Sequence, residues 1–434
     1  MEKLFAGIDL GTSGCRLIII DTDKNIKFRV TLAYSNTDKQ SPELWWHSVS
    51  QLLQNLPSEI KKNLQSIAVD GTSGTVLLVG DNGEPLSSAL MYNDLRATDQ
   101  ATRIKHVLPS NNGGQGASGS LAKVLWLLEN ELQNQEKQGG CALKKVHIQH
   151  QADFILGKLS HNFTLSDENN CLKLGYDVVK KCWPLEALNK LGIDEALLPK
   201  VFPAGTAVDK INHKQAKLLG LPANLQLVTG TTDSIAAFIA TGADNIGDAV
   251  TSLGSTLVLK LISNIPIFSP KHGIYSHRLN KKWLVGGASN SGAKVLQHYF
   301  SQSQIDDMTK FLTPEALTHL NYYPLIATGE RFPIADAKKK AVLTPRPESD
   351  QLFFQGILEG IAKIEAQGFQ KLMELGAPNI TTIRSVGGGS KNTAWTKIRK
   401  NCLDKKHLKI DMITPLQTDA AYGVALLALN GLMK

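Results

Sequence analysis

Two stretches of the sequence place glycine and small hydroxylated residues between apolar runs, a combination that could bind phosphate. The first spans residues 4–21 and has Gly11-Thr12-Ser13 at its centre; the second spans residues 248–260 and has Gly254-Ser255-Thr256 there. The flanking β-rich runs predict a hairpin in each case, with backbone N–H groups and hydroxyls exposed at the turn. One such turn is equally well explained as a solvated hairpin. Two of them in similar halves favour a nucleotide held between two lobes.

Two aspartates stand where a carboxylate could take part in phosphoryl chemistry. Asp9 ends the first apolar run, where it could hold Mg²⁺ against bound phosphates. Asp233 follows the strand-like residues 227–232 at the start of an apolar helix, where an aspartate is also ordinary capping chemistry. The two roles are compatible, because a carboxylate held by a helix start could accept the proton of a substrate hydroxyl as a γ-phosphoryl group arrives.

A third candidate lies in residues 67–80, where a predicted strand is broken by Gly71-Thr72-Ser73-Gly74. A strand end with small hydroxylated residues is where an α/β fold usually binds a small polar ligand. A second hairpin with structural glycines is the alternative that the sequence leaves open.

A fourth candidate lies in residues 383–395, which run from a strand through Gly387-Gly388-Gly389 to a helix start. The glycines permit close approach to a flat or charged ligand. Asn392 offers a donor and an acceptor, and Trp395 could stack on a base. This pattern predicts an adenosine pocket; a glycine-rich turn over a buried tryptophan is the alternative.

The chain is long enough to form the folded domains that would position these residues. It has 434 residues, of which 42% are hydrophobic, so it can bury large cores, and about two or three domains are expected. Residues 42–64 show a helical pattern, and residues 418–432 form a helix of small residues that could pack very closely. We assign both segments to structure rather than chemistry.

Composition and charge argue against several classes of protein. The formal net charge is +8, but the longest basic run is Lys338-Lys339-Lys340, so we expect no nucleic-acid-binding arm. No run of about 18 apolar residues occurs, and a strand is predicted from Leu4 onward, so we expect no membrane span, no signal peptide and cytoplasmic residence. The five scattered cysteines include no Cys-x-x-Cys pair and indicate neither a disulfide framework nor a zinc site.

Three further patterns look like known sites but fail on context. Residues 114–119 fit the dinucleotide fingerprint, but the polar residues 109–112 precede them where that fingerprint requires a strand. Residues 287–294 come close to a Walker A loop, but the lysine falls one place too late. His147 and His150 have no third metal ligand nearby in sequence, so an ordinary surface or core pair is the better interpretation.

The order of motifs along the whole chain resembles that of the FGGY family of carbohydrate kinases. The matching stretches are residues 7–13, 93–97, 123–127, 230–233, 251–256, 329–333 and 387–392. Because the family shares the two-lobed fold of actin and hexokinase, the resemblance implies an α/β protein of two ribonuclease-H-like domains with an active-site cleft between them. We expect a sugar-binding domain over residues 1–239 and a nucleotide-binding domain over residues 240–434, whose last helix could pack back on the first domain.

The resemblance also implies a role for individual residues, with ATP and Mg²⁺ as cofactors. It implies that Asp9 supports Mg²⁺, that Thr12 and Ser13 contact the transferred phosphate, and that Asp233 is the general base. It also implies that the outer phosphates are bound by Gly254, Ser255 and Thr256, and that adenine is surrounded by Gly388, Gly389, Asn392 and Trp395.

The sugar is indicated by a departure from the family pattern. Residues 70–75 replace the Gln-Met-His-Gly motif of a typical xylulose kinase with a hydroxyl-bearing form, and residues 169–177 with Cys182-Trp183-Pro184 resemble the compact D-ribulose kinases of cyanobacteria and plant plastids. We therefore expect a monomeric or homodimeric enzyme that converts D-ribulose to D-ribulose 5-phosphate, with Asp9, Ser73 and Asp233 binding the sugar. The alternatives are a D-xylulose kinase or another FGGY kinase and, from a different class, a non-catalytic ATP-gated sugar-binding protein.

Overall fold

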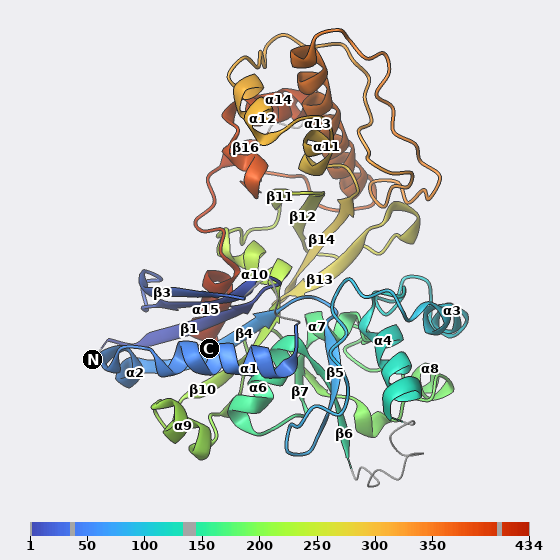
Figure 1. Cartoon of the computed structure of the whole chain (residues 1–434). Helices are drawn as coiled ribbons and strands as arrows, with labels where there is room; N and C mark the ends of the chain where they lie inside the picture. Colours follow the sequence, from blue (N-terminus) through green and yellow to red (C-terminus); the bar gives the residue numbers. More distant parts are fainter. Residues whose placement is uncertain (1, 35–39, 133–144, 406–409, 434) are drawn as a thin grey trace. The chain divides into compact units, whose positions relative to one another are not determined.

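The computed structural model describes residues 2–34, 40–132, 145–405 and 410–433 of the chain. They form two compact units: unit 1 comprises Met1–Ala240 with Asp419–Lys434, and unit 2 comprises Thr241–Thr418. The final helix, α15 (Ala420–Asn430), therefore lies in the same unit as the first strand (Figure 1). Among the helices of the described ranges, none has both the length and the apolar composition needed to cross a bilayer.

Unit 1 is built on a six-stranded sheet in the order β3-β2-β1-β4-β10-β9. β1, β4 and β10 run parallel at its centre, and the other three strands pair antiparallel. Every residue of β1 is buried, as expected for a central strand covered on both faces. The strands are β1 (Leu4–Leu10), β2 (Gly14–Ile20), β3 (Ile26–Ala33), β4 (Leu64–Gly71), β9 (Ala207–Lys210) and β10 (Gln226–Thr232).

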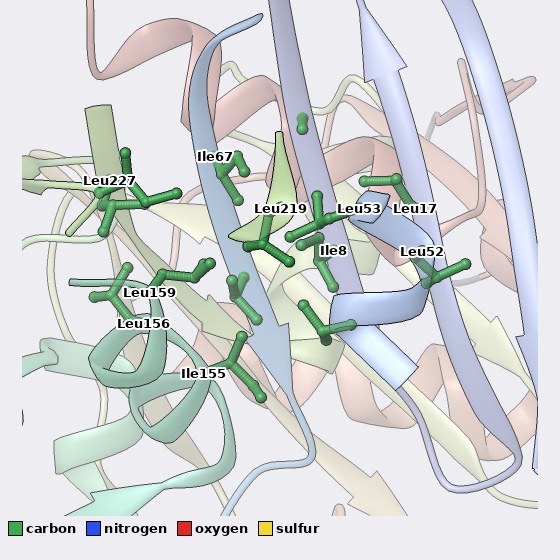
Figure 2. Packing of buried hydrophobic residues seen from close by; sticks show 14 of the residues in the cluster. Ile8, Leu17, Leu52, Leu53, Ile67, Ile155, Leu156, Leu159, Leu219 and Leu227 are labelled. Carbon is green, nitrogen blue, oxygen red and sulfur yellow. The ribbon is translucent and has the colours of Figure 1, made fainter. Parts of the chain in front are cut away.

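One face of this sheet packs against three helices in a single apolar core. Ile8 and Ile67 from the central strands lie among leucine and isoleucine side chains of the helices, including Leu52 and Ile155 (Figure 2). The helices are α1 (Pro42–Gln54), α6 (Gln151–Ser160) and α9 (His213–Leu219).

The helical pattern of residues 42–64 is divided in the structure. The Ser41 side chain accepts a hydrogen bond from the Leu44 N–H and so caps α1, which ends at Gln54. Pro57 precedes a second short helix, α2 (Ser58–Asn63). A single helix over the whole segment was therefore a wrong prediction, because proline has no N–H to donate within a continuous helix.

The opposite face of the sheet is covered by α10 (Asp233–Ala240) and α15. Small residues allow their backbones to approach very closely. A Cβ atom on Gly7 of β1 would lie 2.1 Å from the Ala421 carbonyl oxygen, and one on Gly423 would lie 1.8 Å from the Ala236 carbonyl oxygen. The small side chains of the last helix are thus required by its packing.

A second, smaller core completes unit 1 beside the main sheet. It includes a two-stranded antiparallel sheet, β5 (Val76–Gly80) with β6 (Val146–His150), and the helices α3 (Thr98–Val107), α4 (Ser120–Leu127) and α8 (Leu185–Lys190). Unit 1 also contains β7 (Leu165–Asp167), which pairs in parallel with β8 (Lys200–Phe202), and α7 (Glu168–Leu172). The short helix η1 (Leu128–Leu132) directly follows α4, and η2 (Glu195–Leu197) precedes β8.

Unit 2 contains a second six-stranded sheet, in the order β13-β14-β12-β11-β15-β16. Its strands are β11 (Asp248–Leu253), β12 (Leu257–Ser263), β13 (Tyr275–Leu279), β14 (Lys282–Ser289), β15 (Thr382–Val386) and β16 (Asp411–Ile413). Its helices are α11 (Ala293–Tyr299), α12 (Gln302–Thr309), α13 (Asp350–Glu374) and α14 (Thr393–Asp404), with the short helices η3 (Pro270–His272) and η4 (Gly388–Lys391). The Ser349 side chain caps α13, whose inner face is buried.

The two sheets share a five-stranded plan. In unit 1 the plan is β3-β2-β1-β4-β10, and in unit 2 it is β14-β12-β11-β15-β16. In both, three antiparallel strands are followed by two later strands that add in parallel on the other side. The three antiparallel strands are consecutive in the sequence of unit 1, whereas in unit 2 β13 comes between β12 and β14 in sequence and pairs with the outer side of β14. β1 of unit 1 therefore corresponds to β11 of unit 2, and the hairpin turn that follows each strand occupies the same place.

Candidate active site

In unit 1 the parallel strands bring polar residues together at their carboxyl ends. The register pairs Asp9 of β1 with Asp70 of β4, and Asp70 in turn with Thr231 of β10. Asp233 follows two residues after Thr231, as the first residue of α10. The structure thus gathers two of the predicted site residues, Asp9 and Asp233, around a third acid that was not predicted.

Asp9 is almost completely buried, and an ion pair fixes its orientation. Arg16 lies opposite it across the β1–β2 hairpin and donates from Nη1 to Asp9 Oδ2 at 2.8 Å. The turn between them is closed by a hydrogen bond from the Gly11 N–H to the Gly14 carbonyl oxygen at 3.0 Å. Thr12 and Ser13 are exposed at this turn, so their hydroxyls are available to a ligand.

Asp70 is the acid that sequence reasoning missed. Its side chain is fully buried, no backbone N–H, hydroxyl or amide of the described residues donates to either carboxyl oxygen, and its hydrogen-bonding neighbour is the Asp9 carboxyl. Burial, followed by the charge of Asp9 beside it, raises the pKa of Asp70 well above its ordinary value of 3.8. A signal was present in the sequence, because Asp70 ends an apolar strand just as Asp9 does.

Asp233 combines a partly exposed position with a fixed orientation. Its Oδ1 accepts a hydrogen bond from the Ser234 N–H at 2.6 Å. Its charge also acts on Asp70. A carboxylate at the first position of a helix is stabilised by the positive end of the helix dipole.

Ser73 lies on an elbow that links two different sheets. β4 belongs to the six-stranded sheet and β5 pairs with β6, so the alternative of a simple hairpin at residues 67–80 is wrong. The elbow is fixed by Gln151, whose Oε1 accepts from both the N–H and the hydroxyl of Thr72 at 2.9 and 2.7 Å. The Ser73 side chain stays partly exposed.

In unit 2 the start of α11 holds the turn Gly254-Ser255-Thr256. The Ala293 N–H donates to the Gly254 carbonyl oxygen at 3.0 Å, and the Leu257 N–H donates to the Ser291 carbonyl oxygen at 2.7 Å. Ser255 and Gly254 line a cavity of about 430 Å³ that lies wholly in this unit.

The same cavity gathers most of the residues that the sequence assigned to a nucleotide. Its lining includes Gly388, Gly389, Asn392 and Trp395 in addition to Gly254 and Ser255, whereas Thr256 is not among the lining residues. Apolar walls come from side chains such as Leu296 and Phe354. An apolar cavity with a few polar groups suits a flat heteroaromatic ligand.

Trp395 and Asn392 are held in place before any ligand binds. The Trp395 indole is 2% exposed, donates from Nε1 to the Leu358 carbonyl oxygen at 3.2 Å, and packs against Gly389, where a Cβ atom would lie 2.4 Å from Trp395 Cζ3. Asn392 Oδ1 caps α14 by accepting from the Trp395 N–H at 2.8 Å. The tryptophan therefore supports the glycine turn from beneath; stacking on a base stays a prediction.

A buried ion pair beneath the cavity joins the strands that carry both turns of unit 2. Arg399 donates to both carboxylate oxygens of Glu365, at 2.6 and 2.7 Å. Glu365 also accepts from the Thr251 hydroxyl at 2.6 Å, and Arg399 donates to the Ser385 hydroxyl at 2.8 Å. Sequence reasoning missed this network, since its members lie on four separate elements.

Two of the three motifs that failed on context lie in unit 1 and are ordinary structural features there. Residues 114–119 follow a turn rather than a strand, so the rejection of a dinucleotide site is confirmed. His147 Nε2 lies 2.9 Å from Asp81 Oδ1, whereas His150 lies between Asp153 and Ser120. His150 thus contacts a serine and an aspartate, as the histidine of a hydrolase triad does. Because Ser120 is fully buried, Ser120, His150 and Asp153 form a structural network.

Family models match both halves of the chain. The N-terminal domain of the FGGY family of carbohydrate kinases matches residues 4–240, and the C-terminal domain of the same family matches residues 249–432.

Curated relatives match along nearly the whole chain. The xylulose kinase of Staphylococcus xylosus is 23% identical, over 98% of this chain and 90% of the relative. The gluconokinase of Bacillus subtilis (strain 168) is 21% identical, over 94% of this chain and 84% of the relative.

Solved structures of similar proteins show the fold. A ligand-bound xylulose kinase from Lactobacillus acidophilus superposes with a TM-score of 0.82 at 18% identity, covering 99% of this chain and 90% of that one. A glycerol kinase from Plasmodium falciparum with ADP superposes with a TM-score of 0.81 at 16% identity, covering 98% and 89%. The predicted fold class, two α/β domains of the actin and hexokinase type, is confirmed.

Proposed function

Because this chain belongs to the FGGY family of carbohydrate kinases, we propose that it transfers the γ-phosphoryl group of ATP to the terminal hydroxyl of D-ribulose, giving D-ribulose 5-phosphate. Membership of the family makes the chain an ATP-dependent phosphotransferase that acts on a sugar hydroxyl. The identity of the sugar and the roles of individual residues are the proposed part. In this proposal residues 1–239 bind the sugar and residues 240–434 bind the nucleotide.

The Ser73 elbow is the observation that supports D-ribulose. It presents a small, partly exposed hydroxyl where a typical xylulose kinase carries larger side chains, and Gln151 fixes its backbone. A hydroxyl on a fixed backbone can exchange hydrogen bonds with a sugar hydroxyl in either direction. With Asp9 and Asp233 in the same unit, it supplies three polar groups for a ketopentose.

Asp233 is the proposed general base. The Ser234 N–H donates a hydrogen bond to Oδ1 of Asp233. The carboxylate would accept the proton of the sugar hydroxyl while the hydroxyl oxygen forms its bond to phosphorus. The Thr12 and Ser13 hydroxyls would donate hydrogen bonds to the phosphoryl group during the transfer. No covalent link to the protein is required.

The residues of unit 1 also fit a magnesium ion. The carboxyl groups of Asp9 and Asp70 face one another on neighbouring strands, and Mg²⁺ is usually held by one or two carboxylates together with waters and phosphate oxygens. No group of three or more potential metal ligands occurs within the described residues. When bound, the ion would neutralise charge on the nucleotide phosphates.

Adenine binding is proposed for the cavity of unit 2. Gly388, Gly389, Asn392 and Trp395 would surround the base there, and the turn Gly254-Ser255-Thr256 would bind the outer phosphates through its backbone N–H groups and hydroxyls.

D-Xylulose is the second candidate substrate, because xylulose kinases occur among both the curated relatives and the similar structures. A non-catalytic, ATP-gated sugar-binding protein is disfavoured, since both Asp9 and Asp233 are present at the carboxyl ends of their strands.

An ADP-release assay across sugars tests the proposal. The panel contains D-ribulose, D-xylulose, L-ribulose, ribitol, glycerol and gluconate, each with ATP and Mg²⁺, and phosphorus NMR locates the new phosphate ester. We expect kcat/KM for D-ribulose to exceed that for D-xylulose by about tenfold or more, the size of a difference of one or two hydrogen bonds. A preference for D-xylulose would overturn the choice of sugar, and no turnover with any member would overturn the assignment of ketopentoses as substrates.

A further inference from the structure

Lys173 extends from the end of α7 to the Ser73 elbow. Its Nζ lies 3.3 Å from the Ser73 carbonyl oxygen. Its Cδ would lie 3.2 Å from a Cβ atom on Gly74, a residue whose φ of 86° favours glycine. The side chain therefore runs directly over the elbow, and its ammonium group stands beside the proposed sugar-binding serine.

This ammonium group has more donors than partners. It can donate three hydrogen bonds, yet its only bond within the described chain is the long one to Ser73, and no carboxylate there lies within 4.0 Å of it. Lys173 is half-buried, and burial lowers its pKa, whereas the negative charge of Asp233 opposes that effect. A partly desolvated donor without an acceptor costs free energy. A ligand that supplies an acceptor would remove this cost.

A neighbouring lysine provides the contrast. Lys123 donates from Nζ to the Gly74 carbonyl oxygen at 3.0 Å and to the Met91 carbonyl oxygen at 2.5 Å, and its side chain is fully buried. Two lysines thus bind consecutive carbonyl groups of one elbow. Lys123 is enclosed and well bonded, which marks a structural role, while Lys173 keeps two donors without an acceptor among the described residues and lies close enough to Asp233 for their charges to interact.

We propose that Lys173 is a sugar-binding residue that determines substrate selectivity, and that its ammonium group donates a hydrogen bond to a hydroxyl oxygen of a ketopentose held between Ser73 and Asp233. The inference rests on the proposed sugar-kinase function and adds a residue to that site. A hydroxyl oxygen in this place would complete the bonding of the ammonium group. A ligand without a hydroxyl at that carbon would leave the group unsatisfied and bind more weakly.

The test compares Lys173→Met with Lys180→Met in the full-length enzyme. Methionine keeps the length of the chain but removes the donors and the charge. Lys180 is an exposed lysine seven residues further along the chain, so its substitution removes the same charge away from the elbow. The readouts are KM and kcat for D-ribulose, calorimetric binding of D-ribulose and of a non-hydrolysable ATP analogue, and Tm.

We expect Lys173→Met to raise KM and the calorimetric Kd for D-ribulose by about 10- to 100-fold, the effect of losing a hydrogen bond from a charged donor. Binding of the ATP analogue and Tm should stay near the wild-type values, Lys173→Arg should recover part of the sugar affinity, and Lys180→Met should behave as wild type.

An unchanged sugar Kd for Lys173→Met would overturn the inference, and so would an equal loss of sugar and ATP-analogue binding, which would mark a structural role. These outcomes are distinct from failure of the proposed function. If the wild-type enzyme prefers another sugar of the panel, the same comparison is made with that sugar. If the wild type phosphorylates none of them, the proposed function fails. An active wild type with an unaffected Lys173→Met variant defeats this inference alone.

Discussion

The two sheets share one strand plan but carry different chemistry at the same place. In unit 1 the residue two positions before the turn glycine is Asp9, and it faces Asp70 on the neighbouring parallel strand. In unit 2 the corresponding residue is Ser252, and it faces Val386. Two acids in one sheet thus match a hydroxyl and an apolar side chain in the other. The common plan places a small hydroxyl-bearing turn at the same position in each sheet, and of the two positions only the one in unit 1 carries two facing acids.

The polar groups beneath the turns differ in the same way. In unit 2 the buried Glu365 carboxylate is fully paired with Arg399 and Thr251. In unit 1 the buried Asp70 carboxyl has no cation or N–H donor among the described residues and faces a second acid, Asp9. A satisfied buried network stiffens a structure, whereas an unsatisfied buried acid costs stability and is retained where function needs it. We infer that the acids of unit 1 serve chemistry and the ion pair of unit 2 serves positioning.

The largest expected effect is a loss of catalysis without a loss of nucleotide binding. Asp233→Asn removes the proposed base from unit 1 and should lower kcat by about 10²–10⁴-fold, because the amide cannot accept the hydroxyl proton. Calorimetric affinity for the ATP analogue, assigned to unit 2, should be unchanged. A variant that retains near wild-type kcat would show that the base lies elsewhere.

Breaking the buried ion pair tests whether unit 2 depends on it. Arg399→Met leaves the Glu365 charge buried and unpaired, which should lower the free energy of unfolding by about 3–5 kcal/mol. Urea titration measures this loss. Arg399→Met combined with Glu365→Gln should recover much of it, since no buried charge then remains; failure to recover would show that the arginine acts through packing instead.

Replacement of Asp70 should change the free energy of unfolding in the opposite direction. Asp70→Asn gives unit 1 a neutral side chain of similar shape, so the free energy of unfolding without Mg²⁺ should rise by about 1–3 kcal/mol. The Mg²⁺ concentration needed for half-maximal activity should also rise, and the increase in Tm on adding Mg²⁺ with an ATP analogue should shrink. A destabilised variant with unchanged Mg²⁺ dependence would contradict the assignment of this acid to a metal site.

Two adjacent glycines allow a matched test of the nucleotide cavity. A Cβ atom on Gly389 would collide with the Trp395 ring, whereas one on Gly388 would meet nothing within 4 Å. Gly389→Ala should therefore lower the free energy of unfolding by about 1–3 kcal/mol, and Gly388→Ala should leave it nearly unchanged. Equal effects in thermal unfolding would show that the tryptophan does not restrict this turn.

The last expected effect is a dependence of stability on pH in unit 1. Burial, followed by the charge of Lys173, lowers the pKa of Lys123 from 10.5 to about 8. Between pH 8 and 10.5 the folded state binds fewer protons than the unfolded state, so the free energy of unfolding should rise with pH across this window. The wild-type protein should gain stability relative to Lys123→Met there; parallel pH profiles would contradict the shift.

Local patterns in the sequence determined the turns and the helix starts. Short runs of residues predict both hairpins with hydroxyl-bearing turns, the position of Asp233 at the start of α10 and the glycine turn before Asn392, because turn and capping preferences act over a few residues. The order of these patterns was also enough to identify the family. The helical pattern of residues 42–64 was right in type, and Pro57 divides it.

Only the tertiary structure decided which distant residues meet. Asp70 faces Asp9 because two parallel strands adopt one register, Lys173 reaches the Ser73 elbow from another element, and Arg399 finds Glu365 across two helices. Side-chain periodicity tells which face of a strand or helix is buried, but it does not specify the partner element or its register. The local sequence therefore set the functional groups of this protein, and packing between remote segments set which of them act together.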